Sequence, residues 1–130
     1  MRQLIAALSL TLAFAGHALA LEKEPYSEER FAALQDAGAV VLIDVFADWC
    51  STCKRQQAIL KQYREDNPEK NFHILEVNFD NDKELVRKLR APRQSTLVLY
   101  SGDSQFWYSV AETRPEVIAA ELDKAIAAAQ

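Results

Sequence analysis

The sequence feature that most constrains the fold is a nearly unbroken apolar run from Val40 to Ala47 (VVLIDVFA), which only Asp44 interrupts. A strand with one face in water alternates apolar and polar residues, whereas a strand covered on both faces is apolar throughout. The run therefore predicts a central strand with helices on either side of its sheet. Helical spacing then continues from Cys50 to about Glu65 and predicts a helix that ends before Asn67-Pro68.

Turn and capping residues divide the rest of the chain into short elements. The sequence predicts strands at residues 72–79, 96–100 and 105–110, and helices at residues 27–37 (capped by Ser27), from Asp80 or Asn81 to Leu89, and from the capping-box sequence Thr113–Glu116 onward. The resulting order is helix, strand, helix, strand, helix, strand, strand, helix. This order predicts an α/β fold with a mixed central sheet of about four strands, flanked by helices on both faces.

The first twenty residues have the layout of a secretory signal peptide. Arg2 supplies a positive charge, residues 4–15 carry no charge, and Ala18 and Ala20 are the small residues that a signal peptidase needs. We therefore expect cleavage after Ala20, which leaves one domain at residues 21–130. The alternatives are an amphipathic first helix or an uncleaved anchor, although an apolar run of this length is too short to cross a bilayer.

Composition favours one packed domain and argues against a nucleic-acid partner. Of the 130 residues, 49% are hydrophobic, which is enough for a core. Fifteen Lys and Arg stand against nineteen Asp and Glu, a net charge of −4, and no basic block exceeds two residues. A nucleic-acid-binding surface needs clustered positive charge, so we expect no nucleic-acid partner.

Two cysteines three positions apart are the candidates for chemistry. Cys50 is expected at the N-terminus of a helix, where unpaired N–H groups and the helix dipole stabilise a thiolate and lower the pKa of the thiol. Cys53 lies one turn later, so we expect it to be buried and close enough for a disulfide, while the Cys50 sulfur stays open to solvent. The alternatives are half of a zinc site or a chance pair of core cysteines. A zinc site is short of ligands, because beyond the signal segment His73 is the one histidine.

The sequence from Asp44 to Lys54 (DVFADWCSTCK), directly after the apolar run, resembles the active-site motif of the thioredoxin family. The likeness covers about residues 26–130 and is strongest to exported bacterial proteins, so it implies a thioredoxin fold and a periplasmic location. It also implies that Cys50 attacks a substrate disulfide and that Cys53 resolves the mixed disulfide. Asp44 is then a buried carboxylate that takes the proton of Cys53; the alternative is a solvated residue at the end of a strand.

The same resemblance implies a substrate-binding surface made by Trp49, Gln94 and Ser95. Trp49 either shields the sulfurs and contacts the substrate or is a core residue. Ser95 stands where the family has a cis-proline, unless an insertion shifts the alignment. A cis peptide before a residue other than proline costs about 3 to 4 kcal/mol, so the Gln94–Ser95 bond is cis only if its surroundings enforce it.

Two further positions depart from the family pattern. Glu76 replaces a lysine, and it either points inward and shares a pocket with Asp44 or lies in solvent. Val110 replaces a glycine beside the substrate groove, so its branched side chain is expected to narrow that groove.

These features predict an exported thiol–disulfide oxidoreductase that uses the Cys50–Cys53 pair, needs no cofactor and acts on protein or small-thiol disulfides. A reductant is favoured over an oxidant, with a membrane thiol-electron transporter as its electron donor. We expect a monomer that is not inserted in the membrane after signal cleavage. The alternative is a non-catalytic metal-binding module, in which the two thiolates and Ser95 hold copper(I) or share an iron–sulfur cluster. A structural domain without turnover is the third possibility.

Overall fold

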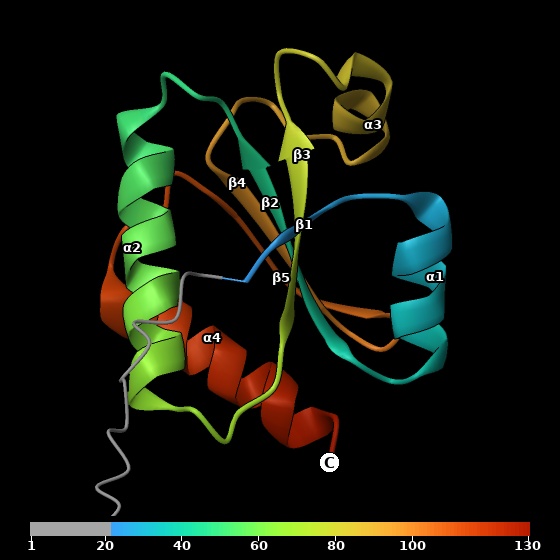
Figure 1. The fold of residues 1–130 in the computed structure, drawn as a ribbon, viewed down its shortest axis with the longest axis vertical. Helices are drawn as coiled ribbons and strands as arrows, with labels where there is room; N and C mark the ends of the chain where they lie inside the picture. The colour runs from blue at the N-terminus through green and yellow to red at the C-terminus, as the bar shows by residue number, and fades with distance from the viewer. Residues whose placement is uncertain (1–21) are drawn as a thin grey trace, which may run out of the picture.

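The computed structural model describes residues 22–130, so the predicted signal peptide lies outside the described residues. The elements along the chain are β1 (Glu24–Pro25), α1 (Glu28–Asp36), β2 (Val40–Phe46), α2 (Ser51–Asp66), β3 (His73–Asn78), α3 (Lys83–Lys88), β4 (Thr96–Ser101), β5 (Ser104–Val110) and α4 (Pro115–Ala128). Figure 1 shows α2 and α4 on one side of the sheet and α1 and α3 on the other. This is the helix-covered mixed sheet that the sequence predicts.

The apolar run of β2 lies at the centre of a five-stranded sheet with the order β1-β3-β2-β4-β5. β2 pairs in parallel with β3 and antiparallel with β4, and β5 returns beside β4 as a hairpin. The hairpin turns at Gly102, whose φ of +58° lies in the left-handed region that glycine adopts without strain. In this register Asp44 of β2 stands between Glu76 of β3 and Leu97 of β4.

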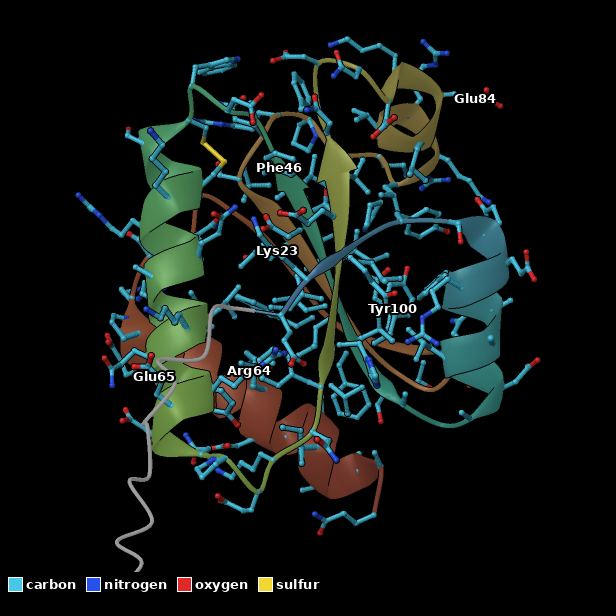
Figure 2. The ribbon with its side chains drawn as sticks, in the orientation of Figure 1. Lys23, Phe46, Arg64, Glu65, Glu84 and Tyr100 are labelled. Atoms are coloured by element: carbon cyan, nitrogen blue, oxygen red, sulfur yellow. A yellow bond between two sulfur atoms is a disulfide. The ribbon has the colours of Figure 1, made fainter. Side chains whose placement is uncertain are left out.

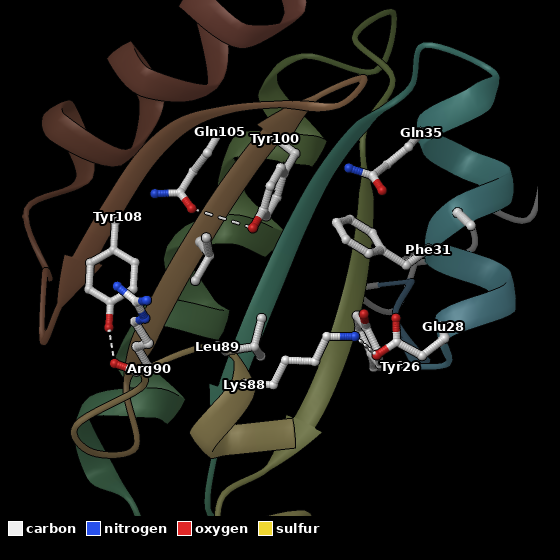
Figure 3. Close-up of a pocket in the computed structure, with 12 residues that line it drawn as sticks. Tyr26, Glu28, Phe31, Gln35, Lys88, Leu89, Arg90, Tyr100, Gln105 and Tyr108 are labelled. Atoms are coloured by element: carbon white, nitrogen blue, oxygen red, sulfur yellow. Dashed lines mark hydrogen bonds and ion pairs between the residues drawn. The ribbon is translucent and has the colours of Figure 1, made fainter. Parts of the chain in front are cut away.

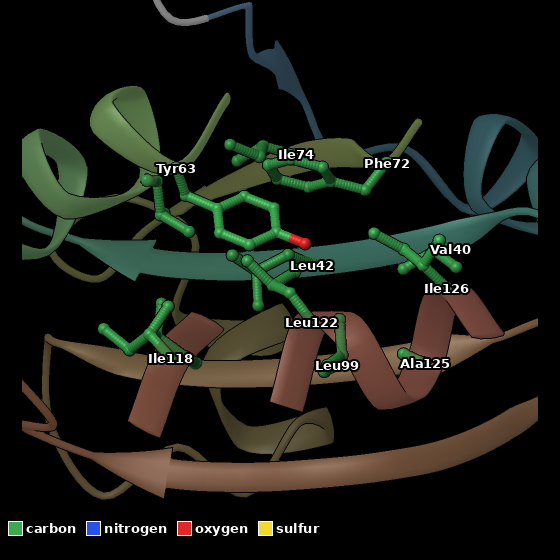
Figure 4. Packing of buried hydrophobic residues seen from close by; sticks show 12 residues of the cluster. Val40, Leu42, Tyr63, Phe72, Ile74, Leu99, Ile118, Leu122, Ala125 and Ile126 are labelled. Atoms are coloured by element: carbon green, nitrogen blue, oxygen red, sulfur yellow. The ribbon is translucent and has the colours of Figure 1, made fainter. Parts of the chain in front are cut away.

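The face of the sheet beneath α2 and α4 carries the larger apolar cluster. Leu42, Ile74 and Leu97 from the sheet pack with Leu60 of α2 and Leu122 of α4, and each is at most 1% exposed. Figure 4 shows Leu42 and Ile74 facing Leu122 across this layer. Because side chains alternate along a strand, Asp44 points to the same face as Leu42.

The opposite face packs against α1 and α3. Ile43, Val45 and Leu75 are fully buried there, with Leu34 of α1 and Val86 of α3 above them. The two clusters together explain why β2 is apolar on both faces. Within residues 22–130, no helix combines the length and the apolar character needed to cross a bilayer.

Three local predictions were wrong. The sheet has five strands because Glu24 and Pro25 pair with β3, and a two-residue strand that contains proline has no periodicity to detect. The N-cap of α3 is Asp82 rather than Asp80 or Asn81. The predicted capping box of α4 does not form: Arg114 is the N-cap, and the Glu112 carboxylate accepts from its backbone N–H at 2.9 Å.

Candidate active site

The two cysteines lie at the start of α2, just after the connection from β2. Cys50 is the N-cap of α2, and its Sγ accepts a hydrogen bond from the backbone N–H of Cys53 at 3.0 Å. The two sulfurs form a disulfide, with the Cα atoms 5.3 Å apart. Figure 2 shows the sulfur–sulfur bond at the first turn of α2. The N-terminal position offers Cys50 the unpaired N–H groups that stabilise a thiolate after reduction.

The disulfide is more enclosed than the sequence predicts. Cys50 is only 3% exposed and Cys53 1%, because both pack against Ala47 and Phe46. The expectation that the leading sulfur is open to solvent is therefore wrong for the oxidised protein. Trp49, in contrast, is 63% exposed. This excludes the alternative that Trp49 is a core residue and places it at the surface.

Trp49 is held at the surface by one specific contact. Its indole Nε1 donates to Asp80 Oδ2 at 2.8 Å, in the loop that follows β3. Trp49 thus directly precedes Cys50 in the sequence, while its indole is anchored to the connection between β3 and α3. This anchoring leaves most of the ring available to another molecule.

Asp44 is fully buried on the face of the sheet that α2 covers. Its Oδ2 lies 3.4 Å from the amide Nε2 of Gln57, and its Oδ1 has no hydrogen-bond partner among the described residues. Burial raises the pKa of Asp44 from its usual 3.8 to about 6, with the Gln57 amide opposing the rise. A carboxyl with this pKa exchanges its proton near neutral pH, as an acid–base residue needs to do.

Glu76 lies between its two expected positions, one buried in a pocket with Asp44 and one in solvent. It lies beside Asp44 on the neighbouring strand, so the two carboxyls are on the same side of the sheet. Its side chain is 17% exposed and accepts from Lys23 Nζ at 2.5 Å. Sequence reasoning missed Lys23, because 53 residues separate it from Glu76 and it lies outside every predicted element.

Ser95 is fully buried and has a φ of +65°, a left-handed conformation that is uncommon for serine. Residues 22–130 contain no cis peptide bond, so Gln94–Ser95 is trans. The Ser95 N–H donates to Val45 O at 2.7 Å. Its carbonyl accepts from the Gln56 amide at 3.1 Å and from the Ala111 N–H at 2.9 Å. Hydrogen bonds to other parts of the chain thus hold the backbone of Ser95 at the position where the family has a proline.

Gln56 is the second residue that the sequence did not single out. It is fully buried on α2, and its Nε2 donates to the carbonyls of both Ser95 and Glu112. The Ser95 hydroxyl donates to the Gln94 carbonyl, and Gln94 itself is half-buried. A glutamine at a helix position otherwise typical of core residues is the only signal that could have indicated it.

Two expectations remain, one for Val110 and one for metal binding. Val110 is 38% exposed at the end of β5, so its side chain lies at the surface, and the narrowing of a substrate groove by it stays a prediction. Within the described part of the chain, no group of three or more His, Cys, Asp and Glu side chains could hold a metal ion.

A cavity of about 620 Å³ lies on the opposite face of the sheet, between α1, α3 and the β4–β5 hairpin. Figure 3 shows the side chains of Phe31, Tyr100 and Tyr108 around it. Tyr108 is fixed by a hydrogen bond of 2.8 Å from its hydroxyl to the Arg90 carbonyl. None of the predicted site residues lines this cavity, so its shape does not bear on the chemistry of the disulfide.

Comparison with known proteins identifies the family that has this fold and this pair of cysteines. Residues 22–124 match the thioredoxin family. The chain belongs to the thioredoxin family. With its Cys-x-x-Cys pair in place, it is a thiol–disulfide oxidoreductase of the thioredoxin type.

Individual relatives agree with this assignment. The chain is similar to the crystal structure of Trxlp from Edwardsiella tarda, with 38% identity, a TM-score of 0.71 and coverage of 78% of this chain and 98% of that one. It is 31% identical to the thioredoxin of Chlamydia trachomatis over 65% of this chain and 79% of that protein. Thioredoxin-2 of Saccharomyces cerevisiae is 27% identical over 61% of this chain and 74% of that protein.

Proposed function

We propose that this thioredoxin-type protein is an exported reductant of disulfides in the bacterial periplasm. The observation that carries the exchange chemistry of this proposal is the geometry of the reacting groups: Cys50 at the N-cap of α2, Cys53 one turn below it, and a buried Asp44 on the sheet face beneath the same helix. The signal-like pattern of residues 1–20 supports export, and cleavage after Ala20 leaves the domain at residues 21–130.

The first step is attack on the substrate. In the reduced protein, Cys50 ionises because the helix N-terminus stabilises its thiolate. The thiolate attacks one sulfur of a substrate disulfide, a bond forms between Cys50 and that sulfur, and the other substrate sulfur leaves with the electron pair and takes up a proton. The product of this step is a mixed disulfide between Cys50 and the substrate.

The second step releases the product. Asp44, as the carboxylate, accepts the proton of the Cys53 thiol, and the resulting thiolate attacks Cys50. The Cys50–Cys53 bond forms, the bond to the substrate breaks, and the second substrate thiol leaves with its electron pair and a proton. The protein then holds the disulfide that the structure shows, having transferred two electrons.

The surface around the pair supports protein substrates. Trp49 offers an exposed indole, and the backbone of Gln94 is proposed to pair with an extended substrate segment. Because the oxidised sulfurs are almost enclosed, regeneration requires a donor that fits this surface. We assign this role to a membrane thiol-electron transporter that recharges a monomeric protein.

The direction of electron flow is tested by the reduction potential of the Cys50–Cys53 pair, measured by equilibration with glutathione buffers. A reductant is expected at about −270 mV, whereas a value of about −120 mV contradicts the proposed direction and marks an oxidant. Cell fractionation with the full-length chain tests export. A mature protein beginning at Leu21 in the periplasmic fraction is the expected result, and an uncleaved protein in the cytosol contradicts it.

A further inference from the structure

The buried carboxylate of the proposed proton exchange has an ionised pair as its neighbour. Asp44 and Glu76 are register partners on adjacent parallel strands, so both project towards the side that α2 covers. Glu76 accepts from the ammonium of Lys23 at 2.5 Å, and both side chains are partly shielded, with exposures of 17% and 32%. An ion pair that is partly withdrawn from water is screened less than one on the open surface.

Lys23 reaches this position from the segment that precedes β1. β1 pairs in parallel with β3, with Glu24 opposite Leu75, and this pairing places the preceding residue over the sheet. The Lys23 ammonium also lies 5.7 Å from the centre of the Phe46 ring. Figure 2 shows Lys23 and Phe46 between α2 and the sheet, on the side of the disulfide. Phe46 in turn packs against the cysteine cluster, so Lys23 belongs to the surroundings of the dithiol.

The groups that face Asp44 come from three elements and from the segment before β1. α2 contributes the Gln57 amide and covers the carboxyl, β3 contributes Glu76, the segment before β1 contributes Lys23, and β4 contributes the apolar Leu97. Glu76 raises the pKa of Asp44 and Lys23 lowers it, in addition to the larger effects of burial and of Gln57. The two members of the pair thus act on the carboxyl with opposite signs.

We propose, on the basis of the proposed function, that Lys23 and Glu76 are positioning residues for the exchange reaction and that their opposed charges set the field at Asp44. The proton that passes from Cys53 to Asp44 moves within this field, although neither member of the pair touches the reacting sulfurs. In a chain cleaved after Ala20, Lys23 is the third residue, so on this proposal a residue close to the cleavage site acts on the Asp44 carboxyl.

The test compares two substitutions that remove opposite charges. Lys23→Met leaves Glu76 uncompensated, and Glu76→Gln leaves Lys23 uncompensated. The titration midpoint of the Asp44 carboxyl, followed by NMR in the oxidised protein, is expected to rise in the first variant and fall in the second by about 0.5 to 1 pH unit. The pH profile of disulfide reduction is expected to move in the same two directions. Lys23→Arg is expected to restore both profiles.

Lys124→Met is the matched control, because it also removes an ammonium from an ion pair, with Glu121 on α4. It is expected to leave the Asp44 midpoint and the rate profile unchanged. The proposal is overturned if Lys23→Met and Glu76→Gln move the midpoint in the same direction or not at all, or if the midpoint moves and the rate profile does not. Wild-type protein without dithiol-dependent turnover contradicts the proposed function itself and removes the basis of this proposal, so the two failures are distinguishable.

Discussion

Two segments meet at the C-terminal end of β2, and they are held in different ways. The dithiol segment takes its geometry from the start of a helix, since Cys50 caps α2 and Cys53 follows one turn later. The segment that ends at Ser95 is held by bonds to distant parts of the chain, namely to Val45, Gln56 and Ala111. The first arrangement is local and could be predicted from spacing. The second depends on tertiary structure, so a change at a single distant residue can alter it.

The largest expected effect follows from imposing the family residue on the second segment. Ser95→Pro removes the N–H that donates to Val45, and the proline ring cannot adopt a φ of +65°. We expect the free energy of unfolding to fall by more than about 3 kcal/mol in urea denaturation of the oxidised protein. Ser95→Gly is the control, because it keeps the N–H and tolerates the positive φ, and it is expected to stay within about 1 kcal/mol of wild type. A Ser95→Pro protein as stable as wild type shows that the segment rearranges freely.

A substitution of Asp44 tests how much the buried carboxylate lowers the stability of the folded protein. Its pKa is raised from 3.8 to about 6 by burial, so the folded protein favours the protonated form. The free energy of unfolding of the wild type is therefore expected to match that of Asp44→Asn below about pH 3.8. It falls below that of the variant as the pH rises from about 3.8 to about 6, and the difference stays constant at higher pH. We expect Asp44→Asn to raise the free energy of unfolding by about 3 kcal/mol at pH 7.5 and to slow disulfide reduction. A variant that is less stable than wild type at pH 7.5 contradicts the buried-charge explanation.

Gln56 tests the long-range bonds without changing the segment itself. Gln56→Ala leaves the carbonyls of Ser95 and Glu112 without their buried donor, so we expect a loss of about 2 kcal/mol in the free energy of unfolding. Arg55→Ala, at the exposed neighbouring position of α2, is expected to change stability by less than about 0.5 kcal/mol. Equal effects of the two substitutions are inconsistent with a clamp at Gln56.

The smallest effect on stability is expected at the surface of the dithiol segment. Trp49 is 63% exposed, so Trp49→Ala is expected to change the free energy of unfolding by less than about 1 kcal/mol, including the loss of its bond to Asp80. The rate of reduction of a protein disulfide is expected to fall several-fold, while that of a small disulfide stays near the wild-type rate. Equal losses with both substrates assign Trp49 to the dithiol itself and not to substrate contact.

Much of the fold could be predicted because its signals are local. The apolar run of β2, the helical spacing after Cys50 and the turn residues between the strands predicted at 96–100 and 105–110 each act within a few residues, and the structure has β2, α2 and the β4–β5 hairpin where these signals place them. β1 escaped prediction, because a two-residue strand is formed by pairing with β3 and not by its own pattern.

The site divides along the same line. The disulfide pair and the burial of Asp44 follow from residues close together in sequence. The roles of Gln56 and Lys23 do not, since their partners lie 39 and 53 residues away. The enclosure of the Cys50 sulfur was also missed, because it depends on how Ala47 and Phe46 pack around the finished pair.

The central claim is that Cys50 attacks and Cys53 resolves, and trapping of the intermediate tests it most directly. Reduced Cys53→Ser protein is mixed with a peptide disulfide and analysed by mass spectrometry, beside reduced Cys50→Ser protein. The account predicts a stable mixed disulfide on Cys50 in the first variant and adduct formation about a hundredfold slower on Cys53 in the second, because the N-terminus of α2 stabilises the thiolate of Cys50, its N-cap, more than that of Cys53 inside the helix. Equal rates in the two variants, or full turnover by Cys50→Ser, contradict the account.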